Sequence, residues 1–220
     1  MILQILGIAA VIGWLGCLSA LALAVRNRWP EQREWSRKVV HIGAGLVLPI
    51  AWGFRISPWI AVPAAGVVTL LALLNHRQRV LPAVEDVDRH SYGTVAYGAS
   101  ITLLLWAGWP AQAAAVCAGV LVMAFGDGLA GLLGPLWGSP SWTVLGQRRS
   151  LLGTGVMGLA SLSTLGALAA FCHARGLPAP GAVAVVWIAV AAALLEQVAI
   201  GGLDNLTVPL AVAALWERLS

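Results

Sequence analysis

Charged side chains are scarce in this chain: Asp, Glu, Lys and Arg make up 10% of its 220 residues, whereas 60% of the residues are hydrophobic. A soluble domain usually carries about a quarter charged residues, so this shortfall excludes a soluble α/β enzyme and a disordered chain. Cysteine is also rare, and the three residues (Cys17, Cys117 and Cys172) lie far apart in apolar stretches, which excludes a secreted disulfide scaffold. The composition therefore predicts an all-α, polytopic membrane protein.

Long apolar runs are what the chain has instead. A spanning helix needs about 20 mostly apolar residues, and candidate runs lie near 2–25, 39–54, 58–75, 92–108, 111–133, 151–173 and 181–200, with a shorter run at 206–216. We predict seven or eight transmembrane helices in one domain, 1–220. The first run has no preceding basic residue and is too long for a signal-peptide core, so we expect 1–25 to remain as the first span.

Basic residues are distributed unevenly between the two sides of this arrangement. The side that is poor in basic residues has Arg55 and Arg175, together with Arg218 if the last run spans the membrane. Because Lys and Arg favour the cytoplasmic side, the richer side is predicted to be cytoplasmic and the N-terminus outside, in a multi-pass protein of the inner cell membrane. This orientation also accounts for the net charge of +4, so no nucleic-acid partner is expected. The richer side consists of loops 26–38, 76–91, 134–150 and 201–205, with Arg26, Arg28, Arg33, Arg37, Lys38, Arg77, Arg79, Arg89, Arg148 and Arg149.

Polar residues that are unusual for a membrane protein gather on the same side. A transporter would have such groups along a path through the middle of the membrane. These groups instead lie at one end of the predicted bundle, where a cytosolic nucleotide can reach them. A small transporter is nevertheless the alternative from another functional class. The gathered residues are Lys38, His41, Glu85, Asp86, Asp88, Arg89, His90, Asp127, Arg148, Arg149, Asp204 and Asn205, with Glu196 about a turn further inside.

The segment 123–155, MAFGDGLAGLLGPLWGSPSWTVLGQRRSLLGTG, holds the strongest polar constellation. A carboxylate at a membrane edge can hold Mg²⁺ together with phosphate oxygens, and adjacent arginines can neutralise a polyphosphate. Packing between helices is the alternative explanation for the glycines, and membrane anchoring for the arginines. Asp127 points more strongly to function, because a carboxylate costs about 2.5–3.5 kcal/mol in the bilayer and nothing near it in sequence neutralises it.

Two further segments carry polar groups beside predicted spans. In 85–97 (EDVDRHSYGTVAY), Glu85 and Arg89 pair at four-residue spacing if the segment is helical, and a solvated loop is equally compatible with the composition. In RKVVH, 37–41, Lys38 suits a membrane anchor. His41 suits either a satisfied interior histidine or a donor to phosphate.

The last constellation follows the seventh apolar run. Glu196 interrupts that run and should face protein or water. Gly201-Gly202 permits a tight turn, after which Asp204 and Asn205 offer oxygen ligands for a hard cation. The sequence Asn205-Leu206-Thr207 matches a glycosylation sequon, but it lies on the predicted cytoplasmic side and is not expected to be used.

Four motifs follow one another over about residues 37–209. In order, they are RKVVH, E-x-x-x-R-H-S-Y-G-T-x-x-Y, GDGLAGLLG…RRSLLGT and E-x₇-DN-x₃-P. This series resembles the CTP-dependent polyprenol kinase family, which includes phytol kinase, dolichol kinase and a diacylglycerol kinase and is related to the phosphatidate cytidylyltransferases. The short length is most similar to the phytol kinase branch. The resemblance implies transfer of the γ-phosphoryl group of CTP to the hydroxyl of an isoprenoid alcohol, phytol-like or geranylgeraniol-like, with Mg²⁺.

The resemblance also implies site roles. Asp127 matches the acidic residue of the nucleotide-binding signature, and Asp204, Asn205 and Pro209 match the C-terminal motif. We expect the general base to be Asp127, Glu85 or His90. The expected metal ligands are Asp127, Asp204, Asn205 and Glu196; the expected substrate contacts are Ser91, Thr94 and Tyr97; and the expected nucleotide contacts are Lys38, His41, Arg89, Gly126, Gly128, Arg148, Arg149, Ser150, Gly153 and Thr154. A cytidylyltransferase that makes a CDP-lipid would use the same signature, although the RKVVH and HSYGT segments favour the kinase.

Overall fold

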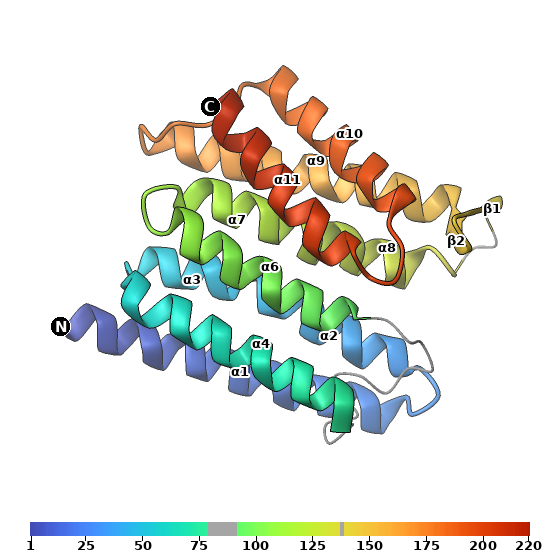
Figure 1. Ribbon diagram of the computed structural model, residues 1–220, viewed down its shortest axis with the longest axis horizontal. Coiled ribbons are helices and arrows are strands. Elements are labelled where there is room, and N and C mark those ends of the chain that lie inside the picture. The colour runs from blue at the N-terminus through green and yellow to red at the C-terminus, as the bar shows by residue number, and fades with distance from the viewer. Residues whose placement is uncertain (79–91, 137–138) are drawn as a thin grey trace.

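The computed structural model describes residues 1–78, 92–136 and 139–220. Successive helices run antiparallel to one another along the bundle, and α2–α3 and α7–η1–α8 each form one continuous rod (Figure 1). The segments are α1 (Ile2–Arg28), α2 (Arg33–Gly45), α3 (Val47–Gly53), α4 (Pro58–Gln78), α6 (Gly93–Gly108), α7 (Ala113–Val122), the π-helix η1 (Met123–Asp127), α8 (Gly128–Leu133), β1 (Ser141–Val144), β2 (Gln147–Ser150), α9 (Leu151–Ala174), α10 (Ala182–Val198) and α11 (Asp204–Leu219).

Most helices coincide with the predicted apolar runs to within a few residues, including the short last run, which forms α11. The run 39–54 is the exception, because α2 begins at Arg33 and α3 follows from Val47, so Lys38 lies in a helix and not in the predicted loop 26–38. In the described part of the chain, four segments are long and apolar enough to cross a membrane, and the apolar helices α6 and α10 are shorter. The chain is therefore a helical membrane protein, and a complement of seven or eight spans stays a prediction. The four segments are Ile2–Arg28, Pro58–Gln78, Ala113–Leu133 and Leu151–Ala174.

The structure is consistent with the all-α prediction and differs from the sequence analysis in one loop, because residues 141–150 form an antiparallel hairpin where a plain loop was expected. Ser141 pairs with Ser150 and Val144 with Gln147. Leu145 and Gly146 make the turn, with φ angles of 49° and 76°. Positive φ at both central residues matches the right-handed twist of the two strands. We call the end of the bundle that carries β1 and β2 the hairpin end.

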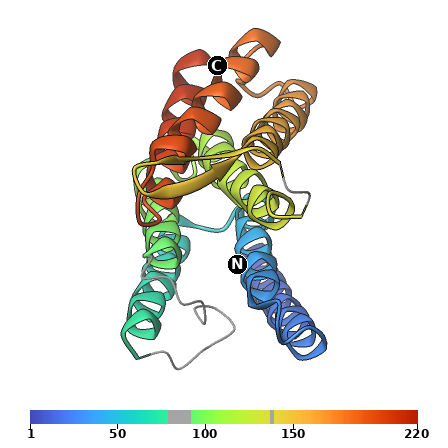
Figure 2. The ribbon, with the colours of Figure 1, turned by 90° about the vertical axis from the view of Figure 1, so that its right-hand side faces the viewer.

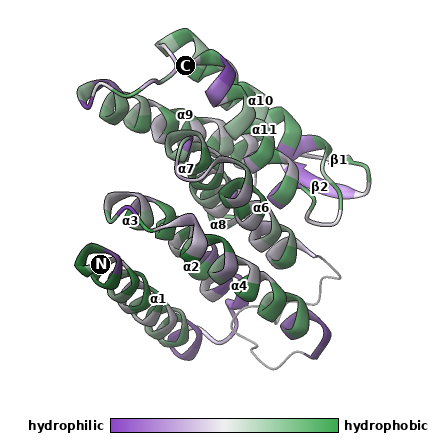
Figure 3. Ribbon diagram, turned by 60° about the vertical axis from the view of Figure 1, so that its left-hand side comes forward, coloured by the Kyte–Doolittle hydropathy of each residue, from purple (hydrophilic) through white to green (hydrophobic). Residues whose placement is uncertain are grey.

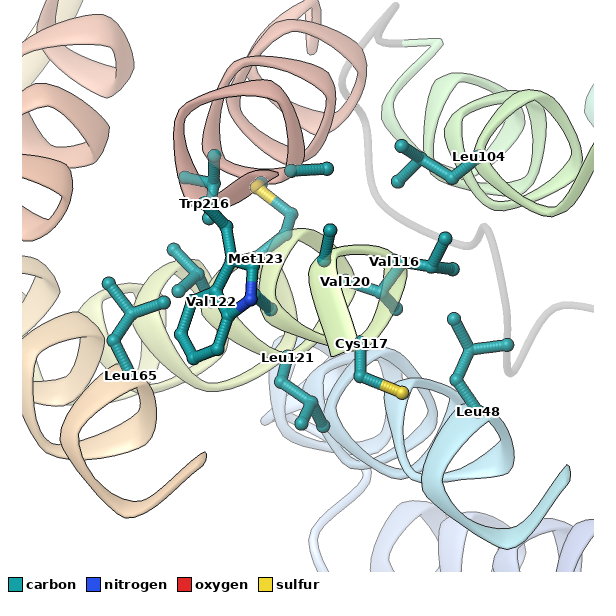
Figure 4. Close-up of a cluster of buried hydrophobic side chains, with 14 of the residues drawn as sticks. Leu48, Leu104, Val116, Cys117, Val120, Leu121, Val122, Met123, Leu165 and Trp216 are labelled. Carbon is teal, nitrogen blue, oxygen red and sulfur yellow. The ribbon is translucent and has the colours of Figure 1, made fainter. Parts of the chain in front are cut away.

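The core of the molecule surrounds α7. Nearly every side chain of α7 is buried, including Val116, Cys117 and Val120. Figure 4 shows Leu165 and Trp216 packed around this helix from α9 and α11. Since α7 continues through η1 into α8, the buried centre of the bundle leads directly to Asp127 at the hairpin end.

The remaining faces suit a bilayer. Most of α1 and α4 is exposed despite its apolar composition. Viewed from the hairpin end, α1–α2 and α4–α6 spread as two arms away from the α7–α11 layers (Figure 2). The helix bodies are mainly hydrophobic, and hydrophilic residues are prominent on the hairpin (Figure 3). An exposed apolar surface of this extent marks contact with lipid.

Candidate functional site

Asp127 ends the π-helix η1 and forms an ion pair with α2. The Lys38 ammonium donates to Asp127 Oδ2 at 2.7 Å and to the Asp127 backbone carbonyl at 3.0 Å. The Lys38 side chain is 5% exposed and that of Asp127 is 18% exposed. The structure thus supplies from a distant part of the chain the neutralising charge that the local sequence lacks.

His41 lies one turn further along α2 and contacts the same carboxylate. Its Nε2 is 3.3 Å from Asp127 Oδ2 and 3.2 Å from the carbonyl oxygen of Met123. Since both neighbours accept hydrogen bonds, the proton of a neutral His41 belongs on Nε2. Tyr97 packs against the imidazole ring, with ring centroids 4.3 Å apart and the ring planes at 31°. Tyr97 is buried, so this predicted substrate residue packs against His41 in the structure.

The glycines of the GDGLAG segment bring helices into close contact. A Cβ atom on Gly128 would lie 2.3 Å from Ile42 Cγ1, and one on Gly131 would lie 2.4 Å from Lys38 Cε. A Cβ on Gly126 would lie 2.5 Å from Met157 Sδ. Glycine at these positions therefore lets α2 and α9 approach the segment that carries Asp127, which agrees with the packing explanation of the pattern.

A second polar cluster joins β2, α9 and α10. Arg149 forms an ion pair with Glu196 and donates from Nη2 to the carbonyl of Ala199 at 3.1 Å. The Gln197 amide donates to Glu196 Oε2 at 2.7 Å and to Thr154 Oγ1 at 2.9 Å. Because neighbouring side chains on a strand point to opposite faces, Arg148 points away from this cluster. It is exposed and donates to Ser141 Oγ at 3.2 Å.

Ser150 and Gly153 form the start of α9. The Ser150 hydroxyl accepts a hydrogen bond from the backbone N–H of Gly153 at 3.1 Å, as an N-cap residue does. Thr154 Oγ1 donates back to the Ser150 carbonyl at 3.0 Å. This RRSLLGT end of the signature thus fixes the join between the hairpin and α9, which places Arg149 and Thr154 beside α10.

Asp204 and Asn205 begin α11 after a turn through Gly201 and Gly202, whose φ angles are 62° and 89°. Asp204 Oδ1 accepts from the backbone N–H and the side-chain Nδ2 of Asn205, both at 3.0 Å. Both residues are 8% exposed. Burial raises the pKa of the Asp204 carboxyl above its ordinary value, and the negative charge of Asp127 acts in the same direction.

These charges belong to one neighbourhood. Asp127 and Arg149 both act electrostatically on Asp204. The charges of Asp127 and Asp204 in turn act electrostatically on Glu196. The hairpin end therefore brings together α2, η1, β2 and α11 (Figure 1), the elements that carry the RKVVH, GDG, RRS and DN motifs.

Other predicted residues are only partly placed. Thr94 is half-buried in the first turn of α6. The N–H of Tyr92, just before that helix, donates to the Gly201 carbonyl at 3.2 Å, so α6 starts next to the turn that precedes Asp204. The predictions for Glu85, Arg89, His90 and Ser91 lie outside the described residues.

The donor set can be tested against magnesium. Among the described residues, no group of three or more His, Cys, Asp or Glu side chains is placed to hold a metal ion. Magnesium needs fewer protein ligands, since it is usually held by one or two carboxylates together with phosphate oxygens and waters. In the described part of the chain, the side-chain contacts to Asp127 use Oδ2 and those to Asp204 use Oδ1, so each carboxylate retains a second oxygen. The residues fit a metal that arrives with a polyphosphate.

Sequence reasoning missed two features of this site. Gln197 joins Glu196 to Thr154, but a glutamine next to a more conspicuous glutamate gives no signal of its own. The π-helix at Met123–Asp127 is also invisible in the apolar pattern. Such single π turns occur frequently at functional sites, and here the turn carries both Asp127 and the carbonyl that His41 contacts.

Comparison with known proteins supplies the family. The chain is 40% identical over 213 residues to the phytol kinase of Synechocystis sp., and the match covers 95% of this chain and 88% of that protein. No family model matches the chain. No solved structure matches it either. Identity of this level over nearly the whole length shows that the chain belongs to the phytol kinase family of polyprenol kinases.

Proposed function

We propose that the protein is a membrane-embedded kinase that transfers the γ-phosphoryl group of CTP to the hydroxyl of an isoprenoid alcohol. In this proposal the reaction takes place with Mg²⁺ at the cytoplasmic face of the inner cell membrane. The relative named phytol kinase supports a lipid-alcohol acceptor. The choice of CTP rests on the resemblance of the motifs to the polyprenol kinases.

One observation carries the proposal most directly. Two carboxylates, Asp127 and Asp204, and two cations, Lys38 and Arg149, come from four different elements and meet at one end of a lipid-facing bundle. Phosphoryl transfer is mainly a problem of positioning and charge neutralisation. A site that combines acidic and basic groups at the edge of an apolar bundle has the charges for this reaction.

The basic residues would bind the nucleotide phosphates. Arg149 Nε is buried and has no hydrogen-bond partner among the described residues, although the rest of its guanidinium is engaged with Glu196 and Ala199. A phosphate oxygen would satisfy this donor with a charge-assisted hydrogen bond. Glu196 then acts as a counter-charge that holds Arg149, and it becomes a metal ligand only if Arg149 moves onto phosphate. Arg148, exposed on the other face of β2, would contribute an outer, salt-sensitive contact.

Asp127 and Asp204 would hold the metal, with Asn205 as a neutral oxygen donor. When bound, Mg²⁺ would neutralise the charge that develops on the transferred phosphoryl group. Lys38 and His41 hold the Asp127 carboxylate in place through Oδ2. In the transfer, the bond between Pγ and the bridging oxygen of CDP breaks and a bond from Pγ to the alcohol oxygen forms. The alcohol proton passes to a base, for which Asp127, Glu85 and His90 are the candidates.

The test is a purified-protein assay that crosses CTP, ATP, GTP and UTP with phytol, geranylgeraniol, farnesol, a long polyprenol and diacylglycerol. The expected result is a phosphorylated isoprenoid alcohol and CDP, with CTP preferred and with turnover abolished by a magnesium chelator. A CDP-lipid and pyrophosphate as products would identify a cytidylyltransferase instead. If no nucleotide stabilises the protein thermally and no acceptor turns over, the kinase proposal is wrong.

A further inference from the structure

An open groove runs along the outer side of α9 and α10, next to the Arg149–Glu196 cluster. Its volume is about 320 Å³, at the lower end of the range for ligand pockets, which is about 300–1,000 Å³. Its lining is apolar except at one end, where Thr154 lies. The groove therefore joins a lipid-facing apolar surface to the polar site at the hairpin end.

The groove is hollow because side chains are missing from its floor. Gly155 and Gly158 line it from α9, and Ala189 and Ala193 line it from α10. Small residues in membrane helices usually bring a neighbouring helix close, and Gly126 does so against Met157. At Gly155 and Gly158, however, an added Cβ would meet no atom within 4 Å. Close packing within this chain does not explain these two glycines, and their place in the lining leaves room there for an apolar ligand.

An unsatisfied acceptor lies next to the Thr154 end of the groove, on a residue that does not itself line it. Gln197 lies one turn beyond Ala193 on α10 and hydrogen-bonds to Thr154. Its amide nitrogen must face Glu196, because an ionised carboxylate only accepts hydrogen bonds. This orientation assigns the opposite atom as Oε1, which is buried and has no hydrogen-bond partner among the described residues. A hydroxyl group is the simplest donor that would satisfy it.

The chemistry of the two ends selects one class of occupant. The ligand needs a long apolar body and a neutral terminal donor. A fatty-acid carboxylate or the phosphodiester of a phospholipid has no hydrogen to donate to Gln197 Oε1, and it would add negative charge to a cluster in which Asp127 and Asp204 already act on Glu196. A long-chain alcohol brings none.

We infer that the groove between α9 and α10 binds the apolar chain of the lipid alcohol, with its hydroxyl donating to Gln197 Oε1. This inference rests on the proposed kinase function and adds the place and orientation of the acceptor. It places the reactive oxygen beside Arg149 and within the electrostatic reach of Asp127. It also assigns α9 and α10, rather than the start of α6, to recognition of the chain.

The first test fills the groove without disturbing the core. Gly158→Leu places a side chain in open space, and the matched control is Gly166→Leu, because Gly166 lies on the same helix, also meets no atom within 4 Å and does not line the groove. We expect Gly158→Leu to raise KM for geranylgeraniol at least tenfold. KM for the short alcohol prenol and the affinity for Mg²⁺-CTP should change less than twofold, and Gly166→Leu should leave all three unchanged. An unchanged KM for geranylgeraniol in Gly158→Leu would overturn the inference.

The second test does not depend on turnover. A diazirine-bearing analogue of geranylgeraniol is photo-crosslinked to the full-length protein without nucleotide, and the adducts are mapped by mass spectrometry. Adducts on residues 154–162 and 186–194 that unlabelled geranylgeraniol competes away support the groove, even if the nucleotide specificity proves different. Adducts that fall mainly on α6 would refute the inference. Adducts that unlabelled geranylgeraniol does not compete away would refute it too, because they would be contacts with bulk lipid. A groove that is covered by a second copy of the chain, with no ligand adducts, would also refute it.

Discussion

Lys38 and Asp127 are 89 residues apart in the chain, yet the ammonium of one lies 2.7 Å from the carboxylate of the other. Each side chain is mostly shielded from solvent. Their pairing explains how a membrane helix tolerates Asp127. It also ties the RKVVH motif to the GDG motif, so that the position of the proposed metal ligand depends on both.

Asp127→Asn should abolish kinase activity, with a loss of at least 100-fold, because the amide lacks the charge that a metal and a polyphosphate require. The amide oxygen still accepts from Lys38, so the variant should remain folded with a lower Tm. The measurement is CTP-dependent phosphorylation together with thermal denaturation in detergent. Substantial turnover in this variant would remove Asp127 from the catalytic site.

The ion pair itself can be separated from catalysis. Removal of one partner of a buried pair costs about 3–5 kcal/mol, because the other charge is left uncompensated. Lys38→Met should therefore lower Tm strongly. The double variant Lys38→Met/Asp127→Asn should lose less stability than the sum of the two single variants and remain inactive. Additive losses of Tm would show that the two residues do not interact in the membrane.

Asp204 gives a prediction for pH. Its pKa is raised in the folded protein, so the protonated form favours folding. That contribution is fully present below the unfolded-state pKa and is lost as pH rises through the folded-state pKa. Without nucleotide, Asp204→Asn should therefore raise Tm near neutral pH and flatten its dependence on pH.

Binding of Mg²⁺-CTP should depend on pH in the opposite direction, because a metal ligand must be deprotonated. In the wild type, stabilisation by Mg²⁺-CTP should increase as pH rises through the pKa of Asp204, and in Asp204→Asn it should be lost. Thermal shifts at several pH values, with and without the nucleotide, measure both effects. Equal stabilisation of the variant by Mg²⁺-CTP would exclude Asp204 as a ligand.

Much of this architecture could be predicted from the sequence, because a membrane requires long apolar helices and they dominate the composition. The boundaries of α1, α4 and α9 follow directly from the apolar runs. The hairpin could not be predicted in the same way, because strands of four residues give too little alternation to stand out from a Gly-, Pro- and Ser-rich loop. Leu145-Gly146 was the available signal, since glycine favours the turn it occupies.

The sequence predicted the end of the bundle at which the candidate residues lie, but not the contacts between them, and their roles stay a prediction. Motif order and the charge asymmetry of the loops place Asp127, Arg149 and Asp204 at the same end. The sequence does not show that Lys38 pairs with Asp127 or that Arg149 pairs with Glu196, since such long-range pairs depend on which helices are neighbours. The glycines show the same limit, because identical residues close a helix contact at Gly128 and leave a groove at Gly158.

The two adjacent arginines provide a matched pair. Arg149→Ala would leave Glu196 buried beside Asp127 and Asp204 without its counter-charge, so we expect a marked loss of Tm and of CTP affinity. Arg148→Ala removes an exposed side chain on the opposite face of the same strand. It should change stability by less than about 0.5 kcal/mol and raise KM for CTP only modestly, an effect that salt screens. Equal effects of the two variants on stability would contradict the orientation of β2.

The role of the signature glycines can be decided by a compensating change. Gly128→Ala introduces a Cβ 2.3 Å from Ile42 Cγ1, and overpacking of this kind costs about 1–3 kcal/mol. If Gly128 serves packing between α8 and α2, Gly128→Ala/Ile42→Ala should recover most of the lost Tm and activity, because the smaller side chain vacates that space. Gly166→Ala is the control, and there alanine should stabilise α9 by up to about 1 kcal/mol. If Tm recovers in the double variant but activity stays lost, Gly128 also contacts the nucleotide through its backbone. The packing defect has then been repaired, and the added Cβ blocks only the close approach of a phosphate.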